Sequence, residues 1–205
     1  MIEISSYISN WATSFFGHLN ETPWHATNQA AVVVDNALKV LGTDYNVTNR
    51  VAVHSSANVE NGAIIKGPAI IGPNCFVAAT AYLRDGVFLD QNCTIGPACE
   101  LKSAFVFLGA KIAHLNFVGD TLIGSHVNIE AGAIIANYHN EKADKHIRIQ
   151  AGNEIINTGV DKFGALIGDG CHIGANAVIA PGAILAPGFF LERLGLLNQY
   201  PTSTG

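Results

Sequence analysis

The sequence predicts an all-β solenoid, in which the chain winds into short coils that stack on one another. An aliphatic residue recurs every six residues over most of the chain, a period that neither a helix nor a long strand has. Glycine makes up 21 of the 205 residues, above the usual ~7%, which favours an architecture dense in turns. Hydrophobic residues account for 49% and charged residues for 13%, the composition of a folded protein with a large core.

Residues 1–50 are expected to form a helical segment ahead of the coils. Two stretches look helical, Ile2–Gly17 and Thr27–Leu41. Thr27 has the residue type of an N-cap, and Gly42 that of a stop just past the end of the second helix. We expect these helices to plug the open end of the solenoid, and a contact between copies of the chain is the alternative.

The repeat predicts coils over residues 51–190, with the aliphatic residues pointing inward. The step of six shortens to five at Val106 and at Ile123. A polar and charged interruption at about residues 138–163 reads as an external loop, and loops of this length are usually functional or disordered. Residues 191–205 are expected to form a C-terminal tail. The repeat positions are Val53, Val59, Ile65, Ile71, Val77, Leu83, Leu89, Ile95, Leu101, Val106, Ile112, Val118, Ile123, Ile129, Ile135, Ile167, Ile173, Ile179 and Leu185.

The four cysteines are expected to be reduced packing residues. Each follows an aliphatic repeat position by four residues, in a slot that alanine fills in other coils. No CxxC pair and no Cys–His zinc spacing is present, so no metal site is expected. The cysteines are Cys75, Cys93, Cys99 and Cys171.

Charge and hydropathy exclude several partners. A net charge of −5 argues against non-specific nucleic-acid binding, which needs clustered Lys and Arg. Apolar runs such as Ala30–Val34 fall far short of the ~20 residues of a membrane span. The first residues carry neither a basic region nor a long apolar run, so no signal peptide is expected. We therefore expect a cytoplasmic protein with neither nucleic acid nor membrane as partner.

The repeat resembles the hexapeptide motif of the left-handed parallel β-helix, in which three hexapeptides form one triangular coil. The stretch from Tyr82 to Tyr138 further resembles the acetyltransferase half of the bifunctional glucosamine-1-phosphate acetyltransferase/N-acetylglucosamine-1-phosphate uridyltransferase family, and also related sugar-phosphate nucleotidylyltransferases. The hand of the helix follows from this resemblance alone. The matching pieces are LRDG (83–86), ELK (100–102), AHLNFVGD (113–120), IGSHVNIEAGAIIANY (123–138) and KFGALIGDGCHIGANAVIAPGAIL (162–185).

The resemblance implies the catalytic and donor-binding residues. His114 falls on the catalytic base of the family, and Asn137 and Tyr138 fall on the segment beside the thioester. Either Asn137 or a backbone N–H would stabilise the oxyanion. The pantetheine of coenzyme A would lie near Gly174 and Ala175.

The resemblance also implies the acceptor-binding residues. Arg84 and Lys102 fall on ligands of the acceptor phosphate, and Asn128 falls on an acceptor-binding amide. Arg84 and Lys102 are 18 residues apart, hence one coil apart, where two cations would repel unless an anion lay between them. The alternative is that they pair with the chain's own carboxylates, Asp85, Asp90 or Glu100.

Two positions depart from the family pattern. Phe117 stands where the family usually has Tyr, which removes a hydroxyl from the acceptor site. Glu130 stands where the relatives commonly have Gly, and we expect it to pair with an amino-sugar ammonium or to exclude a larger acceptor.

The expected activity is acetyl transfer from acetyl-CoA to the amine of an amino-sugar phosphate resembling glucosamine-1-phosphate, with neutral His114 as general base and without a metal. No Gly-rich nucleotide loop follows an N-terminal strand, so the nucleotidyltransferase half is expected to be missing. A homotrimer with sites between subunits is expected, because one face of a triangular prism is too flat to enclose two substrates. Lys142 or Lys145 of the loop would reach a neighbour's site.

Two alternatives remain open. One is an O- or N-acyltransferase on a nucleotide-linked sugar or a lipid-A-type precursor. The other is a non-catalytic, ligand-binding β-helix trimer.

Overall fold

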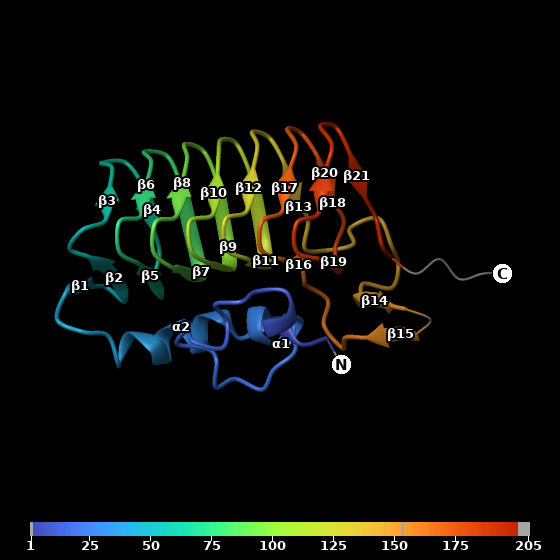
Figure 1. Ribbon diagram of the computed structural model, residues 1–205, viewed down its shortest axis with the longest axis horizontal. Coiled ribbons are helices and arrows are strands. Elements are labelled where there is room, and N and C mark those ends of the chain that lie inside the picture. Colours follow the sequence, from blue (N-terminus) through green and yellow to red (C-terminus); the bar gives the residue numbers. More distant parts are fainter. Residues whose placement is uncertain (1, 153, 201–205) are drawn as a thin grey trace.

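The computed structural model describes residues 2–152 and 154–200, and they form a parallel β-helix with three flat faces (Figure 1). Strands of successive coils pair in parallel on each face, as the sequence predicts. The predicted left-handed β-helix, preceded by short helices, is confirmed. The aliphatic repeat positions also point inward as predicted: Ile71, Leu89 and Ile112 are each fully buried.

Each face collects one short strand, or one part of a longer strand, from every coil. Face 1 contains β2 (Val51–His54), β5 (Ala69–Ile71), the second parts of β7 (Tyr82–Leu89), β9 (Glu100–Val106) and β11 (Phe117–Ile123), then β16 (Ala165–Ile167) and β19 (Ala183–Leu185). Face 2 is a seven-stranded sheet of β3 (Asn58–Val59), β6 (Phe76–Val77), β8 (Thr94–Ile95), β10 (Lys111–Ile112), β12 (Asn128–Ile129), β17 (His172–Ile173) and β20 (Phe190–Leu191). Face 3 contains β4 (Ile64–Ile65), the first parts of β7, β9 and β11, then β13 (Ile134–Ile135), β18 (Val178–Ile179) and β21 (Leu196–Leu197).

Most corners turn through a single residue in the left-handed region of backbone conformation. Where faces 2 and 3 meet, this residue is Thr80, Ala98 or Leu115 in three successive coils, with φ of 67°, 55° and 56°. A small side chain fills the inside of each corner, as Ala81 and Cys99 do here. All four cysteines are buried in such corners and free, as expected for packing residues.

The expected N-terminal helices differ from the observed ones. Ile2–Gly17 is not a helix, because only a single 3-10 turn forms, at Ile4–Ser6. The second stretch contains only the end of α1 (Pro23–Asn28) and the whole of α2 (Ala30–Leu38), and α2 ends before Gly42. Thr27 lies inside α1 instead of capping a helix, because its hydroxyl donates to the carbonyls of Pro23 and Trp24, both at 3.2 Å. A strand, β1 (Tyr45–Thr48), then pairs antiparallel with β2 and is the first strand of that sheet.

The N-terminal segment does not plug the end of the solenoid. It lies along the side of the coils and covers face 1 (Figure 1). The outward positions of that face are apolar, and Trp11, Phe16 and Trp24 pack on them. The sequence indicates that face 1 is covered, because two apolar residues in succession are typical of a strand that is buried on both sides. The outward residues are Ile70, Phe88, Phe105, Leu122 and Leu166.

The external loop contains secondary structure, and the coils extend further toward the C-terminus than expected. Between β13 and β16 the chain forms an antiparallel hairpin of β14 (Arg148–Ala151) and β15 (Glu154–Asn157). Ile147 and Ile149 pack in the hydrophobic cluster on face 1. The coils continue past residue 190 through β21, so the expected tail boundary is too early. Residues 201–205 of the expected tail lie outside the described residues. No helix in the described part of the chain is long and apolar enough to cross a membrane.

Phe16→Ala is expected to lower the free energy of unfolding by ~3–5 kcal/mol, the usual cost of truncating a buried aromatic residue. Phe16 is 1% exposed, and its ring lies 4.8 Å from those of both Phe88 and Phe105. Phe15→Ala is the matched control, because Phe15 is 39% exposed. Urea unfolding measures both, and equal losses would contradict the assignment of Phe16 to the face 1 core.

Candidate active site

The residues predicted to form the site lie along two opposite edges of face 3. His114 lies at the corner between β10 and β11, where faces 2 and 3 meet. Arg84, Lys102 and Asn137 lie at the other edge, where faces 3 and 1 meet. Phe117 stands outward on the face between them, next to Glu100 of the preceding coil. A single chain therefore does not bring His114 next to the Arg84–Lys102 pair.

The His114 turn is tightly held although the side chain is exposed. Its Nδ1 lies 3.2 Å from the position that a Cβ on Gly96 would occupy, so the imidazole leans over the preceding coil. The buried Asn116 fixes the turn from inside, because its amide donates to the carbonyls of Glu130 (2.7 Å) and Ala133 (3.3 Å). Sequence reasoning missed Asn116. The sequence offered one indication: Asn116 follows an aliphatic repeat position by four residues, where other coils have alanine or cysteine.

The edge that carries His114 also carries the residues expected to hold coenzyme A. Backbone hydrogen bonds link its corners in order: Gly132 donates to the His114 carbonyl, Asn176 to that of Ala131, and Leu194 to that of Ala175. Ala175 is therefore two coils from His114, which at ~4.8 Å per coil is about 10 Å. His114, Gly174 and Ala175 thus share one edge, as an extended donor would require.

A groove of about 430 Å³ opens beside this edge, on the last coils of face 2. It brings together three predicted site residues, Asn128, Glu130 and Gly174. Asn128 projects from β12 next to His172 of β17. Phe190, Glu192 and Arg193 complete the wall, although the sequence placed the last two in the tail.

Glu130 is held by the chain itself. Its Oε2 accepts hydrogen bonds from the Arg193 Nε (2.9 Å) and the Ala175 N–H (2.8 Å), while Oε1 accepts one from Arg193 Nη2 (2.9 Å). The bond from Arg193, with the Ala175 N–H second, lowers the pKa of Glu130 from 4.5 to about 2. Both carboxylate oxygens are engaged, so the expected pairing with an acceptor ammonium would have to displace Arg193.

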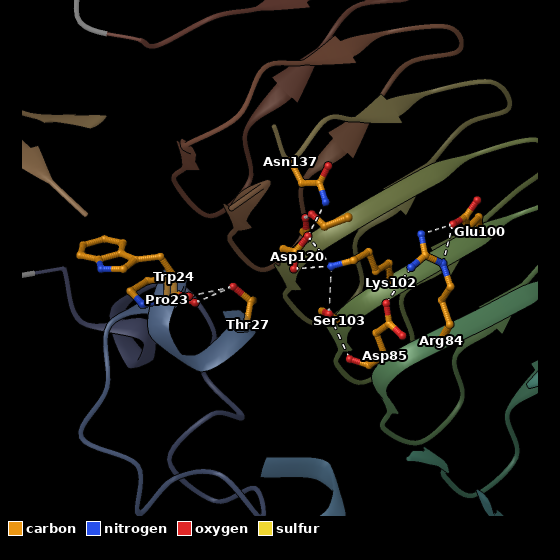
Figure 2. Close-up of polar contacts among 12 residues, drawn as sticks. Pro23, Trp24, Thr27, Arg84, Asp85, Glu100, Lys102, Ser103, Asp120 and Asn137 are labelled. Atoms are coloured by element: carbon orange, nitrogen blue, oxygen red, sulfur yellow. Dashed lines mark hydrogen bonds and ion pairs between the residues drawn. The ribbon is translucent and has the colours of Figure 1, made fainter. Parts of the chain in front are cut away.

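Arg84 and Lys102 occupy paired positions on β7 and β9, side by side as predicted (Figure 2). The anions beside them are the chain's own carboxylates. Arg84 contacts Asp85 at 2.6 Å and Glu100 at 2.8 Å, which is the alternative pairing considered from the sequence. These contacts already relieve the repulsion between the two cations, so the pair does not require a bound anion.

Lys102 belongs to a more buried pair that the sequence did not reveal. Its Nζ donates to both oxygens of Asp120, at 2.8 and 3.0 Å, and the side chains are 15% and 4% exposed. The Asn137 amide also donates to Asp120, so Asn137 holds this carboxylate in place (Figure 2). Asp85 and Asp120 have φ of 61° and 44°, at equivalent corners of their coils. This edge thus holds two cations among three carboxylates.

Comparisons with known proteins give the family. Residues 67–161 match the GMPPB C-terminal domain, and residues 157–186 match the hexapeptide repeat of succinyl-transferase. A bifunctional sugar-1-phosphate nucleotidylyltransferase/acetyltransferase of Sulfurisphaera tokodaii is 31% identical over 162 residues, covering 77% of this chain and 40% of the relative. The bifunctional protein GlmU of Nitratidesulfovibrio vulgaris is 34% identical over 147 residues, 64% of this chain and 32% of the relative. The chain is a hexapeptide-repeat protein homologous to the acetyltransferase region of GlmU-type proteins.

The chain spans less than half the length of these curated relatives. Among solved structures, a hexapeptide transferase family protein from Anaplasma phagocytophilum is 18% identical, with 75% of this chain and 80% of that chain covered and a TM-score of 0.43.

The remaining predicted residues of this hexapeptide-repeat protein lie in or near the external loop. Tyr138 is 36% exposed, and its ring centroid lies 5.2 Å from the Lys145 Nζ. Lys145 donates to the carbonyls of His139 and Asn140, and Lys142 lies 4.0 Å from the ring centroid of Tyr200. Both lysines therefore contact their own chain. Within residues 2–152 and 154–200, no group of three or more His, Cys, Asp or Glu is placed to hold a metal ion.

Lys102→Ala is expected to destabilise the hexapeptide-repeat protein by ~3–5 kcal/mol, because it leaves the Asp120 charge buried without its partner. Arg84→Ala is the control, with an expected loss of about 1 kcal/mol or less, since Arg84 is 27% exposed. Urea unfolding gives both values. Asp120→Asn in the Lys102→Ala background should recover part of the loss, and failure to recover would show that the buried charge is not its cause.

Glu130 gives a stability difference that depends on pH. Its pKa is lowered on folding, so its contribution is fully present above about pH 4.5 and is lost as the pH falls through about 2. The melting temperature of Glu130→Gln should therefore lie below that of the wild type at pH 6 and approach it as the pH falls toward 2. Glu192→Gln serves as the control, and a difference that does not change with pH would refute the lowered pKa.

Proposed function

We propose that this chain is an acetyl-CoA-dependent N-acetyltransferase that acts on an amino-sugar phosphate, with His114 as general base. The observation that carries the proposal is the shared edge: an exposed imidazole lies two coils from Gly174 and Ala175, beside an open groove. A donor extended along this edge would present its thioester to His114. Homology to the acetyltransferase region of GlmU-type proteins supports the same chemistry.

The proposed reaction is a direct acyl transfer. Neutral His114 accepts a proton from the acceptor amine while the nitrogen attacks the thioester carbonyl. The new C–N bond forms, the C–S bond breaks, and the coenzyme A thiolate leaves and takes up a proton. A backbone N–H of the His114 edge would stabilise the oxyanion. Asn137 of the same chain lies at the opposite edge and donates to Asp120, so it would serve only from a neighbouring copy.

We propose that a homotrimer completes the site. The predicted acceptor residues and His114 lie on opposite edges of face 3, so a cyclic assembly would place the Arg84 edge of one copy beside the His114 edge of the next. The outward residues of face 3 support a contact there, because Ile64, Val178 and Leu196 are apolar and 55%, 38% and 70% exposed. In the same assembly, Lys142 or Lys145 would have to leave its loop contacts to reach a neighbour. The four buried thiols support a reducing, cytoplasmic compartment.

The ion pairs of Arg84 and Lys102 favour a second candidate for the acceptor. A phosphate at Arg84 and Lys102 would have to compete with Asp85, Glu100 and Asp120. An acceptor without a free phosphate monoester, such as a nucleotide-linked amino sugar, would not need that displacement.

His114→Ala is expected to reduce the rate of coenzyme A release from acetyl-CoA and glucosamine-1-phosphate by ~10²–10⁴-fold, the usual contribution of a general base. Coenzyme A affinity should stay unchanged. Thiol detection and calorimetry measure the two quantities. His126→Ala is the control, since His126 is an exposed histidine at another corner. Full activity in His114→Ala would overturn the assignment of the base.

Arg84→Ala separates the two acceptors. If Arg84 holds a phosphate, the KM for glucosamine-1-phosphate should rise by roughly 10- to 150-fold, the loss of one charge-assisted hydrogen bond. The KM values for acetyl-CoA and for unphosphorylated glucosamine should not change. An unchanged KM for glucosamine-1-phosphate, together with turnover of a nucleotide-linked amino sugar, would replace the first acceptor with the second.

A further inference from the structure

The groove on the last coils of face 2 contains a set of hydrogen-bond donors. A carboxylate from an earlier coil accepts their hydrogen bonds. The Ala175 N–H and the Arg193 guanidinium come from two successive corners and converge on one point. The group at that point is the Glu130 carboxylate, from the corner one coil earlier than Ala175. We call these donors, from Ala175 and Arg193, the anion notch.

The donor set of the anion notch suits a phosphate as well as a carboxylate. A guanidinium offers two parallel N–H groups to an oxyanion, and a backbone N–H adds a third, fixed donor. The notch also opens to solvent, because the Arg193 side chain is 73% exposed and that of Glu130 is 35% exposed. A ligand in the 430 Å³ groove can therefore reach it.

The fold does not depend on this occupancy. The backbone N–H of Glu130 donates to the Ile173 carbonyl at 2.8 Å, and that of Gly174 to the Leu191 carbonyl at 2.8 Å, so the coils are joined without the side chain. The Glu130 side chain thus makes contacts that a ligand can replace without breaking a coil.

We propose that Glu130 is an intramolecular competitor, whose carboxylate occupies an anion notch that a phosphate-bearing ligand must take over to bind in the groove. The ligand is a phosphate-bearing donor such as coenzyme A, and this part rests on the proposed function. Glu130 sets the affinity of the groove for such ligands, and only an anion that bonds to both Ala175 and Arg193 displaces it.

Protonation does not open the notch near neutral pH. The hydrogen bonds from Arg193 and Ala175 lower the pKa of Glu130 to about 2, so the carboxylate stays charged. His172 and Glu192 are the other ionisable groups of the groove wall. Displacement by an anionic ligand is therefore the way in which the notch is freed.

Calorimetric titration with coenzyme A tests the proposal. Glu130→Ala is expected to lower the Kd about 3- to 10-fold, because the free notch no longer has to be vacated. Glu192→Ala is the matched control, since it removes the same charge from the same groove without freeing Arg193. Arg193→Ala in the Glu130→Ala background should abolish the gain. Glu130→Gln, which keeps the side-chain size, should change the Kd in the same direction.

Two further probes separate this inference from the proposed function. Pantetheine has no phosphate, so its Kd should be equal for wild type and Glu130→Ala. Inorganic pyrophosphate should bind Glu130→Ala more tightly than wild type. If pyrophosphate shows this gain and coenzyme A binds no variant, the notch stands and the proposed donor is wrong. If coenzyme A binds wild type and Glu130→Ala equally, or Glu192→Ala gains as much, the notch is refuted while the donor stands. Absence of pyrophosphate binding to Glu130→Ala also refutes the notch.

Discussion

The in-register stacking of coils is the constraint on which the rest of this structure depends. On each face, the strands of neighbouring coils pair in parallel, and an inward aliphatic residue of one coil stacks on that of the next. A residue placed at a corner therefore has its equivalents ~4.8 Å away along the same edge. Polar groups from distant parts of the sequence can then meet at one edge, as the Glu130 carboxylate, the Ala175 N–H and the Arg193 guanidinium do.

The three faces of the β-helix differ in whether another part of the chain covers them, because their outward residues differ. Face 1 carries Phe88 and Phe105, and the N-terminal segment covers it with Trp11 and Phe16. Faces 2 and 3 carry exposed residues such as Phe190 and Leu196. The edge between these faces carries His114, and the groove lies beside that edge on face 2. The covered face thus leaves faces 2 and 3 for the ligands and partner copies that we propose.

The Lys102–Asp120 and Glu130–Arg193 ion pairs contribute differently to the structure because they differ in burial. Asp120 is almost fully enclosed with Lys102, so separating the pair would leave a charge without water or partner. Glu130 and Arg193 meet at the surface, where water can replace either partner at small cost. The first pair therefore behaves as part of the framework, and the second is suited to exchange with a ligand.

The sequence by itself determined the coils, their inward residues and the adjacency of Arg84 and Lys102, because a fixed period translates directly into stacking. His114 and Ala175 each follow an aliphatic repeat position, Ile112 and Ile173, by two residues, so the period alone puts them at equivalent corners of their coils. Only the tertiary structure decided that the N-terminal segment covers a side instead of an end, because the outward residues of several strands must be seen together. The partners of Lys102 and Glu130 were likewise decided in three dimensions. Arg193 is 63 residues from Glu130, across the external loop, and only the return of the chain to the solenoid brings their charges into contact.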